Sequence, residues 1–122
     1  MAIDEGLVDW VVEAMAPVGA ITRRAMMGGA TLYCDGVVFA IADHDGVLWF
    51  KADSESDSVW DAAGCARFTY EMNGRPGSMN YRRAPDDVYD DPDELRRWGC
   101  LGLEAGRRAP PKKRGKATRA KM

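Results

Sequence analysis

Residues 31–51, TLYCDGVVFAIADHDGVLWFK, decide the fold of this chain. Three apolar runs rich in Val, Ile, Phe, Trp and Tyr, at residues 31–34, 37–42 and 47–51, are separated by short polar gaps. Asp35-Gly36 fills the first gap, and Asp45-Gly46 ends the second. An Asp-Gly pair between apolar runs is a strong hairpin signal, because the tight turn needs positive φ angles that Asp tolerates and Gly adopts freely. The stretch therefore predicts a three-stranded antiparallel meander.

The residues before the meander predict an amphipathic helix and a short extended segment. Apolar residues recur at three- and four-residue steps from Ile3 to Met15. Pro17 ends this pattern, because the residue before a proline is disfavoured in helical geometry. Residues 21–27 are expected to form a short strand or an extended approach to the meander, and Gly28-Gly29 lets the chain bend into it.

The segment after the meander predicts a short helix and a second hairpin. Ser54 is the expected cap of a helix of about two to three turns, and Gly64 is its expected stop. Asn73-Gly74 then predicts a turn between strands at residues 65–71 and 77–81. Pro76 confines its part of the hairpin to a sheet edge or to the start of a strand.

The strongest helix start in the chain is Asp91-Pro92, where an N-cap acceptor precedes a proline at the first helical position. Glycines at 99, 102 and 106 each cost this last helix about 1 kcal/mol relative to Ala, so the helix must depend on docking. They also give it a flat face that suits close approach to the sheet or to a second copy.

These elements predict a two-layer α+β domain whose antiparallel sheet, a meander plus a hairpin, is covered by helices in the order α-β(3-4)-α-β(2)-α. The 122 residues suit one domain, and 46% apolar content is typical of a globular chain. We place the domain at residues 1–106 and a disordered basic tail at 107–122. No apolar run reaches the roughly 20 residues of a membrane span, and the start lacks signal-peptide features, so we expect a cytoplasmic protein without membrane contact.

Charge is divided unevenly along the chain. Residues 1–106 hold all 19 acidic residues and 9 of the 17 basic ones, a net charge of −10, whereas 107–122 hold 8 basic residues and no acid. Such a cationic segment can neutralise phosphates without reading bases. The alternatives are a solvated terminus or a segment that folds back on the acidic domain. The candidate nucleic-acid-binding residues are Arg107, Arg108, Lys112, Lys113, Arg114, Lys116, Arg119 and Lys121.

A second basic group lies within the domain. It consists of Arg23, Arg24, Arg75, Arg82 and Arg83. Pairing with the domain's many acids is the favoured interpretation of these arginines. If they instead share one face, they form a docking patch for a protein or a nucleic acid.

The sequence contains no clear catalytic motif. His44, the single histidine, lies between Asp43 and Asp45, but turn chemistry already explains Asp45-Gly46. Three cysteines without a CxxC or a second histidine predict no metal site, and we interpret them as small apolar side chains. No catalytic residue, metal or cofactor is therefore predicted, and an enzyme would need a deep pocket at His44 or at a cysteine.

In consistent order over about residues 5–106, the chain resembles the N-terminal domain of the TfoX/Sxy family of competence regulators. Two departures are Met27, where the family usually has an aromatic residue, and the basic tail in place of the family's C-terminal helical domain. The resemblance implies this fold and a role beside the cAMP receptor protein at competence promoters. The segments that carry it are RAMMGG at 24–29, LYCDGVVFA at 32–40, DGVLWFK at 45–51, FTYE at 68–71, GRPGSMNY at 74–81, Ala84-Pro85 and DDPDEL at 90–95.

Two hypotheses for function follow. The first is a non-enzymatic TfoX-like accessory factor in transcription or competence regulation, with a transcription factor as partner and a tail that contacts DNA or RNA. The second is a protein-interaction module that self-associates, for example as a homodimer, without a nucleic-acid role.

Overall fold

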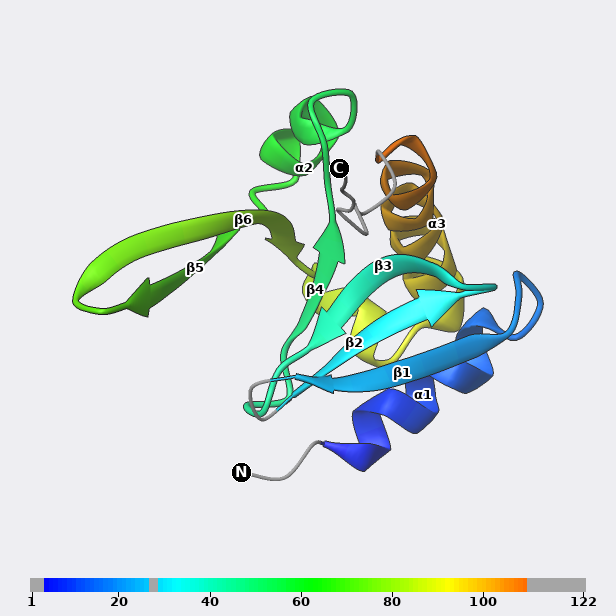
Figure 1. Cartoon of the computed structure of the whole chain (residues 1–122). Helices are drawn as coiled ribbons and strands as arrows, with labels where there is room; N and C mark the ends of the chain where they lie inside the picture. Colours follow the sequence, from blue (N-terminus) through cyan, green and yellow to red (C-terminus); the bar gives the residue numbers. More distant parts are fainter. Residues whose placement is uncertain (1–3, 27–28, 110–122) are drawn as a thin grey trace, which may run out of the picture.

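The computed structural model describes residues 4–26 and 29–109, and it confirms the predicted α+β class with a six-stranded antiparallel sheet (Figure 1). Within these described residues, the helices pack on one face of the sheet and leave the other face without a helix. The elements are α1 (Glu5–Met15), β1 (Ile21–Met26), β2 (Gly29–Cys34), β3 (Val37–Ala42), β4 (Leu48–Lys51), α2 (Asp57–Ala62), β5 (Arg67–Met72), β6 (Arg75–Arg83), the 3-10 helix η1 (Asp86–Tyr89) and α3 (Pro92–Arg108).

The strand order is β1-β2-β3-β4-β6-β5. The predicted meander is confirmed as β2-β3-β4, and the turn between β2 and β3 has positive φ at Asp35 (50°) and Gly36 (84°). The extended segment before the meander pairs with β2 as strand β1. The sequence thus predicts the centre of the sheet from its turn residues.

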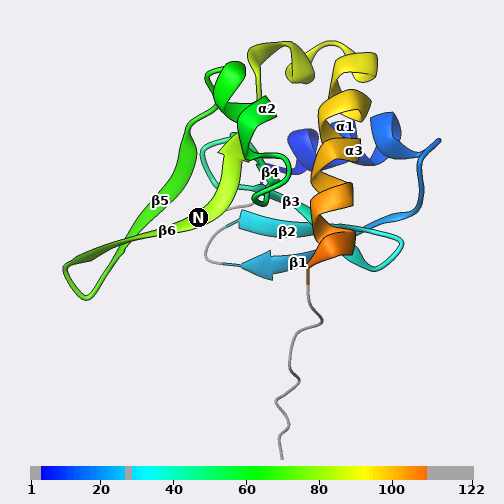
Figure 2. The ribbon, with the colours of Figure 1, turned by 90° about the horizontal axis from the view of Figure 1, so that it is seen from above.

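The second hairpin is also confirmed, with positive φ at Asn73 (55°) and Gly74 (73°). Its second strand, β6, begins before the predicted position and includes Pro76, whose strand partner is Glu71. Only the last part of β6, Tyr81–Arg83, pairs with β4. The rest of the β5–β6 hairpin therefore projects from the body of the molecule (Figures 1 and 2).

A stack of aromatic rings lies at the centre of the core. Phe50 of β4 lies 6.5 Å from Phe39 and 5.8 Å from Trp60, measured between ring centroids, and Trp60 lies 4.9 Å from Trp98 of α3. Full burial of one such side chain stabilises a fold by roughly 1.5–3 kcal/mol. The six-residue α2, too short to be stable by itself, is anchored in the core through Trp60.

Helix α3 approaches the sheet along its glycines, which resolves one of the alternatives left by the sequence. A Cβ atom at Gly102 would lie 2.7 Å from the Phe39 carbonyl oxygen, and one at Gly106 would collide with the Val38 carbonyl. Asp91 caps this helix as predicted, because its carboxylate accepts hydrogen bonds from the backbone N–H groups of Asp93 and Glu94.

The predicted cap of α2 is wrong, because the helix follows Ser56 and not Ser54. Ser56 and Asp53 form a closed turn instead. The Asp53 carboxylate accepts a hydrogen bond from the Ser56 backbone N–H at 3.1 Å, and the Ser56 hydroxyl accepts one from the Asp53 N–H at 3.0 Å. This reciprocal pair closes the turn of residues 53–56 that leads into the helix.

Candidate functional site

The first two residues of the predicted tail belong to helix α3. Arg107 and Arg108 form its last turn, where cations complement the helix dipole. Arg108 is also bound to the domain, because its guanidinium donates to the Asp53 carboxylate at 2.7 and 2.9 Å and lies 3.4 Å from Glu55. The other six candidate residues, Lys112, Lys113, Arg114, Lys116, Arg119 and Lys121, lie outside the described residues.

The ion pair between Arg108 and Asp53 lowers the pKa of the Asp53 carboxyl. The hydrogen bonds from Arg108 are the main reason why the pKa of Asp53 falls from 3.8 to about 2, and burial opposes the shift. Asp53 thus connects the start of the α2 region to the end of α3. Arg108 already has protein partners, which makes it a weaker candidate for phosphate binding than the sequence suggests.

Arg82 lies in the interior of the fold and pairs with acids, which is the favoured interpretation, whereas the docking-patch alternative would need it on a surface. Its side chain is only 2% exposed and lies between β6 and α2. It donates to the carboxylates of Asp61 (2.7 Å) and Asp57 (3.1 Å), to the Cys65 carbonyl (3.1 Å) and to the Asn80 side chain (3.2 Å). This network satisfies a buried charge and fastens α2 to the sheet.

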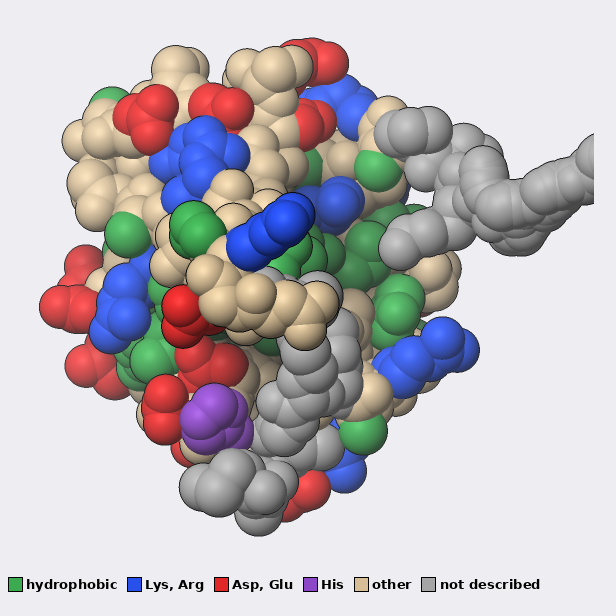
Figure 3. All heavy atoms as spheres, turned by 60° about the vertical axis from the view of Figure 1, so that its left-hand side comes forward, with side chains coloured by type: hydrophobic (Ala, Val, Ile, Leu, Met, Phe, Trp, Pro, Cys, Tyr) green, Lys and Arg blue, Asp and Glu red, His purple; other side chains and the backbone are tan. Residues whose placement is uncertain are grey.

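The other four arginines of the predicted patch are spread over the molecule. Arg23 and Arg24 lie on β1, at one end of the sheet order, and Arg23 pairs with Glu5 at 2.6 Å. Arg75 is exposed near the turn of the projecting hairpin, and Arg83 lies on the helix-free sheet face. Figure 3 views the side from which the hairpin projects, and its basic side chains are mixed with acidic ones. Pairing with acids, the favoured alternative, therefore describes Arg23 and Arg82.

The helix-free face of the sheet carries rings and cations in alternation. The strand register places Trp49 opposite Arg83 and Lys51 opposite Tyr81. The Arg83 guanidinium lies 5.9 Å from the centre of the Trp49 ring, and the Lys51 ammonium lies 5.2 Å from that of Tyr81. Burial raises the pKa of the Tyr81 hydroxyl to about 12. Two aromatic rings and two cations of β4 and β6 thus lie side by side on this face.

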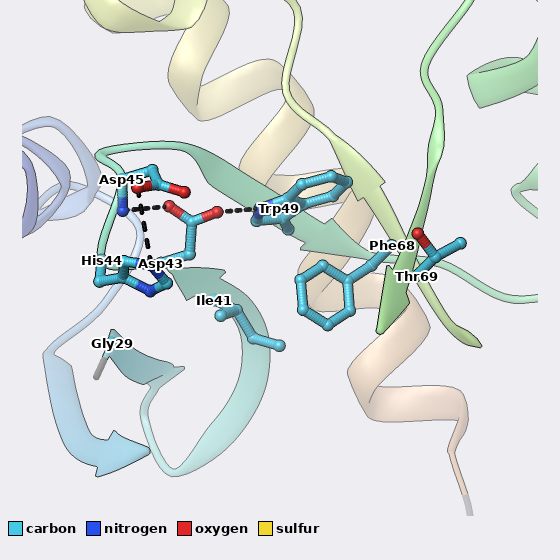
Figure 4. Close-up of a pocket in the computed structure, with 8 residues that line it drawn as sticks. All are labelled: Gly29, Ile41, Asp43, His44, Asp45, Trp49, Phe68 and Thr69. Atoms are coloured by element: carbon cyan, nitrogen blue, oxygen red, sulfur yellow. Dashed lines mark hydrogen bonds and ion pairs between the residues drawn. The ribbon is translucent and has the colours of Figure 1, made fainter. Parts of the chain in front are cut away.

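A pocket of about 300 Å³, open to solvent, lies at the end of this face beside the β3–β4 loop (Figure 4). Trp49 and Phe68 form its walls, with ring centroids 4.9 Å apart and an interplanar angle of 76°. Ile41 of β3, which is three strands away from β5 in the sheet, contributes an apolar surface. The lining residues are Gly29, Ile41, Asp43, His44, Asp45, Trp49, Phe68 and Thr69.

Asp43 organises the rim of this pocket. One of its carboxylate oxygens accepts hydrogen bonds from the backbone N–H groups of Asp45 and Val47, and the other accepts one from the Trp49 indole, each at 2.9 Å. The loop geometry is thus set by an aspartate that closes the turn, in line with the turn interpretation of this segment. His44 is exposed, and its Nε2 lies 3.6 Å from the Asp45 carboxylate.

The remaining chemical groups are in the expected surroundings. Cys34 and Cys65 are buried and Cys100 is partly buried, which fits their interpretation as apolar side chains. Burial raises the pKa of both buried thiols, which disfavours the reactive thiolate. Within residues 4–26 and 29–109, no cluster of three His, Cys, Asp or Glu side chains could hold a metal ion, and no helix is long and apolar enough to cross a membrane.

The fold and its sequence define the class of protein. Residues 13–106 match the family described as TfoX N-terminal domain, so the chain belongs to this family. It is also 29% identical over 93 residues to "Protein Sxy" of Escherichia coli (strain K12). That alignment covers 76% of this chain but 44% of Sxy, so the chain spans less than half the length of this relative.

Sequence reasoning missed the pocket walls. It placed Trp49 and Phe68 in separate strands, as β4 and β5 confirm, but did not bring them together. One signal was present, because both residues belong to apolar runs whose alternation assigns each strand a buried and an open face. The order β4-β6-β5, which decides how the strands meet, has no such local signal.

Proposed function

We propose that the protein is a non-enzymatic, cytoplasmic accessory factor in gene regulation, related to Sxy, whose basic C-terminal segment makes sequence-tolerant contacts with nucleic acid. The observation that carries this proposal is the division of charge. Eight Lys and Arg residues, and no acid, follow a domain in which acidic residues outnumber basic ones by ten. Membership of the TfoX N-terminal domain family supports the regulatory part, and a transcription factor is the proposed protein partner.

The basic segment offers fewer residues for phosphate binding than its charge count suggests. Arg108 is held by Asp53 and Glu55, so phosphate binding rests on Arg107 and on the six cations of residues 110–122. Cations that neutralise phosphates release condensed counterions from DNA. Binding through this segment is therefore expected to weaken steeply with salt and to vary little with base sequence.

The test is a titration of duplex DNA with the full chain at several salt concentrations, followed by fluorescence anisotropy. With six phosphate contacts, the slope of log K against log salt is expected near about −5. Replacing the six cations of residues 110–122 by Gln is expected to remove this salt-dependent binding.

The matched control replaces three exposed arginines of the domain by Gln, namely Arg24, Arg67 and Arg75. This variant is expected to retain the salt slope. Binding that survives the loss of the six tail cations, or that disappears only in the control variant, contradicts the proposal and assigns the contact to the domain.

Self-association is the second candidate function, and one feature of the sheet favours it. In the described chain, β1 pairs only with β2 and β5 only with β6, so each presents an open strand edge. Open edges are suited to strand pairing with another copy. Light scattering that gives a dimer mass unaffected by the six-Gln substitution, together with absent DNA binding, would favour this candidate over the first.

A further inference from the structure

The pocket beside the β3–β4 loop combines aromatic walls with an acidic rim (Figure 4). Trp49 and Phe68 meet nearly edge to face. The faces of aromatic rings carry partial negative charge and attract organic cations, and sites that recognise quaternary ammonium groups use several rings in this way. The walls alone therefore favour an apolar group or an organic cation over an anion.

The charges at the rim of the pocket favour an organic cation over an apolar group. Among the described residues that line the pocket are Asp43 and Asp45, and none of these lining residues is Lys or Arg. The Asp43 carboxylate is held in place before any ligand arrives, because three donors of the protein bind it. A fixed carboxylate next to ring faces complements a positive charge and disfavours the phosphate of a nucleotide.

The molecule contains examples of the same preference on the same face. Arg83 lies over the Trp49 ring and Lys51 lies over the Tyr81 ring, at 5.9 and 5.2 Å from their centres. The rings of this face thus already accept guanidinium and ammonium groups. Phe68 and Thr69 belong to the edge strand β5, where an extended segment of another polypeptide can approach.

From this geometry we infer that the pocket binds the side chain of a lysine or arginine on a partner protein. The cation lies against the rings of Trp49 and Phe68, and the carboxylates of Asp43 and Asp45 compensate its charge. This inference is independent of nucleic-acid binding by the C-terminal segment. The proposed ligand is an exposed basic side chain of a partner protein. Neither the family nor the division of charge along the chain specifies such a ligand.

The test follows the indole N–H signal of Trp49 by NMR in the full ¹⁵N-labelled chain, with the signal assigned from its loss in Trp49→Phe. Three probes are titrated: a terminally capped Gly-Lys-Gly peptide, the same peptide with norleucine in place of lysine, and adenosine monophosphate. The lysine peptide is expected to shift the Trp49 signal in a saturable way. Norleucine, which keeps the aliphatic chain and lacks the charge, is expected to bind at least threefold more weakly.

Substitutions separate the two parts of the site. Asp45→Asn removes a charge whose carboxylate is 73% exposed, so the fold is expected to persist, and affinity for the lysine peptide is expected to fall about two- to fivefold. Phe68→Leu is expected to weaken binding by a similar factor. Glu104→Gln on α3, away from the pocket, serves as the matched control and is expected to leave affinity unchanged.

Three results would overturn the inference: equal binding of the norleucine and lysine peptides, stronger binding of adenosine monophosphate, or unchanged affinity in Asp45→Asn. A fourth concerns the source of the cation. If replacing the six basic residues of 110–122 by Gln makes the lysine peptide bind several-fold more tightly, the chain's own segment competes for the pocket and a partner protein is not its occupant.

Discussion

Adjacent arginines at 82 and 83 have opposite roles, because successive residues of a strand point to opposite faces of a sheet. Arg82 faces the helices, where a buried guanidinium needs partners, and four side-chain or backbone acceptors surround it. Arg83 is exposed on the helix-free face and lies over Trp49. No pattern in the sequence distinguishes the two residues.

Replacing Arg82 by Met is expected to lower the free energy of unfolding by about 3 kcal/mol, because the change removes the donor to the Cys65 carbonyl and to the Asp61 carboxylate and leaves Asp57 with the Asn80 amide. Arg83→Met, a matched change one residue away, is expected to cost less than about 1 kcal/mol. Urea unfolding of both variants measures the difference. Equal losses would show that the network around Arg82 does not hold α2 to the sheet.

Asp53 provides a pH-dependent contact between the α2 region and α3. Its pKa in the folded protein, about 2, is below the ordinary 3.8, so the contact with Arg108 stabilises the fold fully above pH 3.8. This contribution is lost as the pH falls from 3.8 towards 2, because the carboxyl then becomes protonated.

Arg108→Gln is therefore expected to raise the pKa of Asp53 towards its ordinary value, as read from the titration of its side-chain carbonyl signal by NMR. Arg97→Gln, which removes an exposed cation from another part of the same helix, is the control and should leave this pKa unchanged. A titration of Asp53 near 2 in Arg108→Gln would show that other groups cause the shift.

At the scale of elements, α3 illustrates why a helix can retain three glycines. Each glycine lowers intrinsic helix stability by about 1 kcal/mol, but a side chain at Gly102 or Gly106 would press against carbonyl groups of β3. The strand backbone cannot move aside without disturbing the sheet. Close packing of α3 on β3 and β4 therefore depends on these positions.

Gly106→Ala is expected to destabilise the protein by about 1–3 kcal/mol, since overpacking outweighs the gain in helix propensity. Gly99→Ala should cost clearly less, because its nearest neighbour is the flexible thioether of Met15 and not backbone. Thermal unfolding of the two variants provides the comparison. A stabilised Gly106→Ala variant would contradict the close approach of α3.

Turns and caps were the elements that the sequence predicted best. Asp35-Gly36 and Asn73-Gly74 adopt the positive φ angles that their types suggest, and Asp91-Pro92 begins α3. The predicted cap of α2 is wrong because Asp53 and Ser56, and not Ser54, close the turn that precedes the helix. Turn and cap residues therefore predict local structure well where one hydrogen-bonding arrangement is clearly preferred, and poorly where neighbouring residues offer a second one.

At the scale of the whole molecule, the chain divides into a long acidic part and a short basic C-terminal segment. Within residues 4–26 and 29–109, the buried apolar residues lie between Leu7 and Ala105. Without residues 110–122, the chain has 19 acidic and 11 basic side chains, a net charge of −8.

A chain that ends at Ala109 is therefore expected to unfold within about 4 °C of the full chain, which corresponds to less than about 1 kcal/mol. Circular dichroism melting curves at equal protein concentration provide the measurement. A larger decrease would mean that the basic segment stabilises the acidic domain, one of the alternatives that the charge division leaves open.

The amino-acid sequence by itself determined the turns, the strands beside them, the capped start of α3 and the division of charge. These features depend on residues close together in the chain, whose preferred φ angles and hydrogen bonds are set locally. Only the tertiary structure decided that β6 lies between β4 and β5, that Arg82 is buried against α2, and that Trp49 and Phe68 share a pocket with Asp43. Those outcomes depend on which strands pair and how the sheet curves. Both are determined by packing between residues far apart in the chain, so no local sequence pattern predicts them.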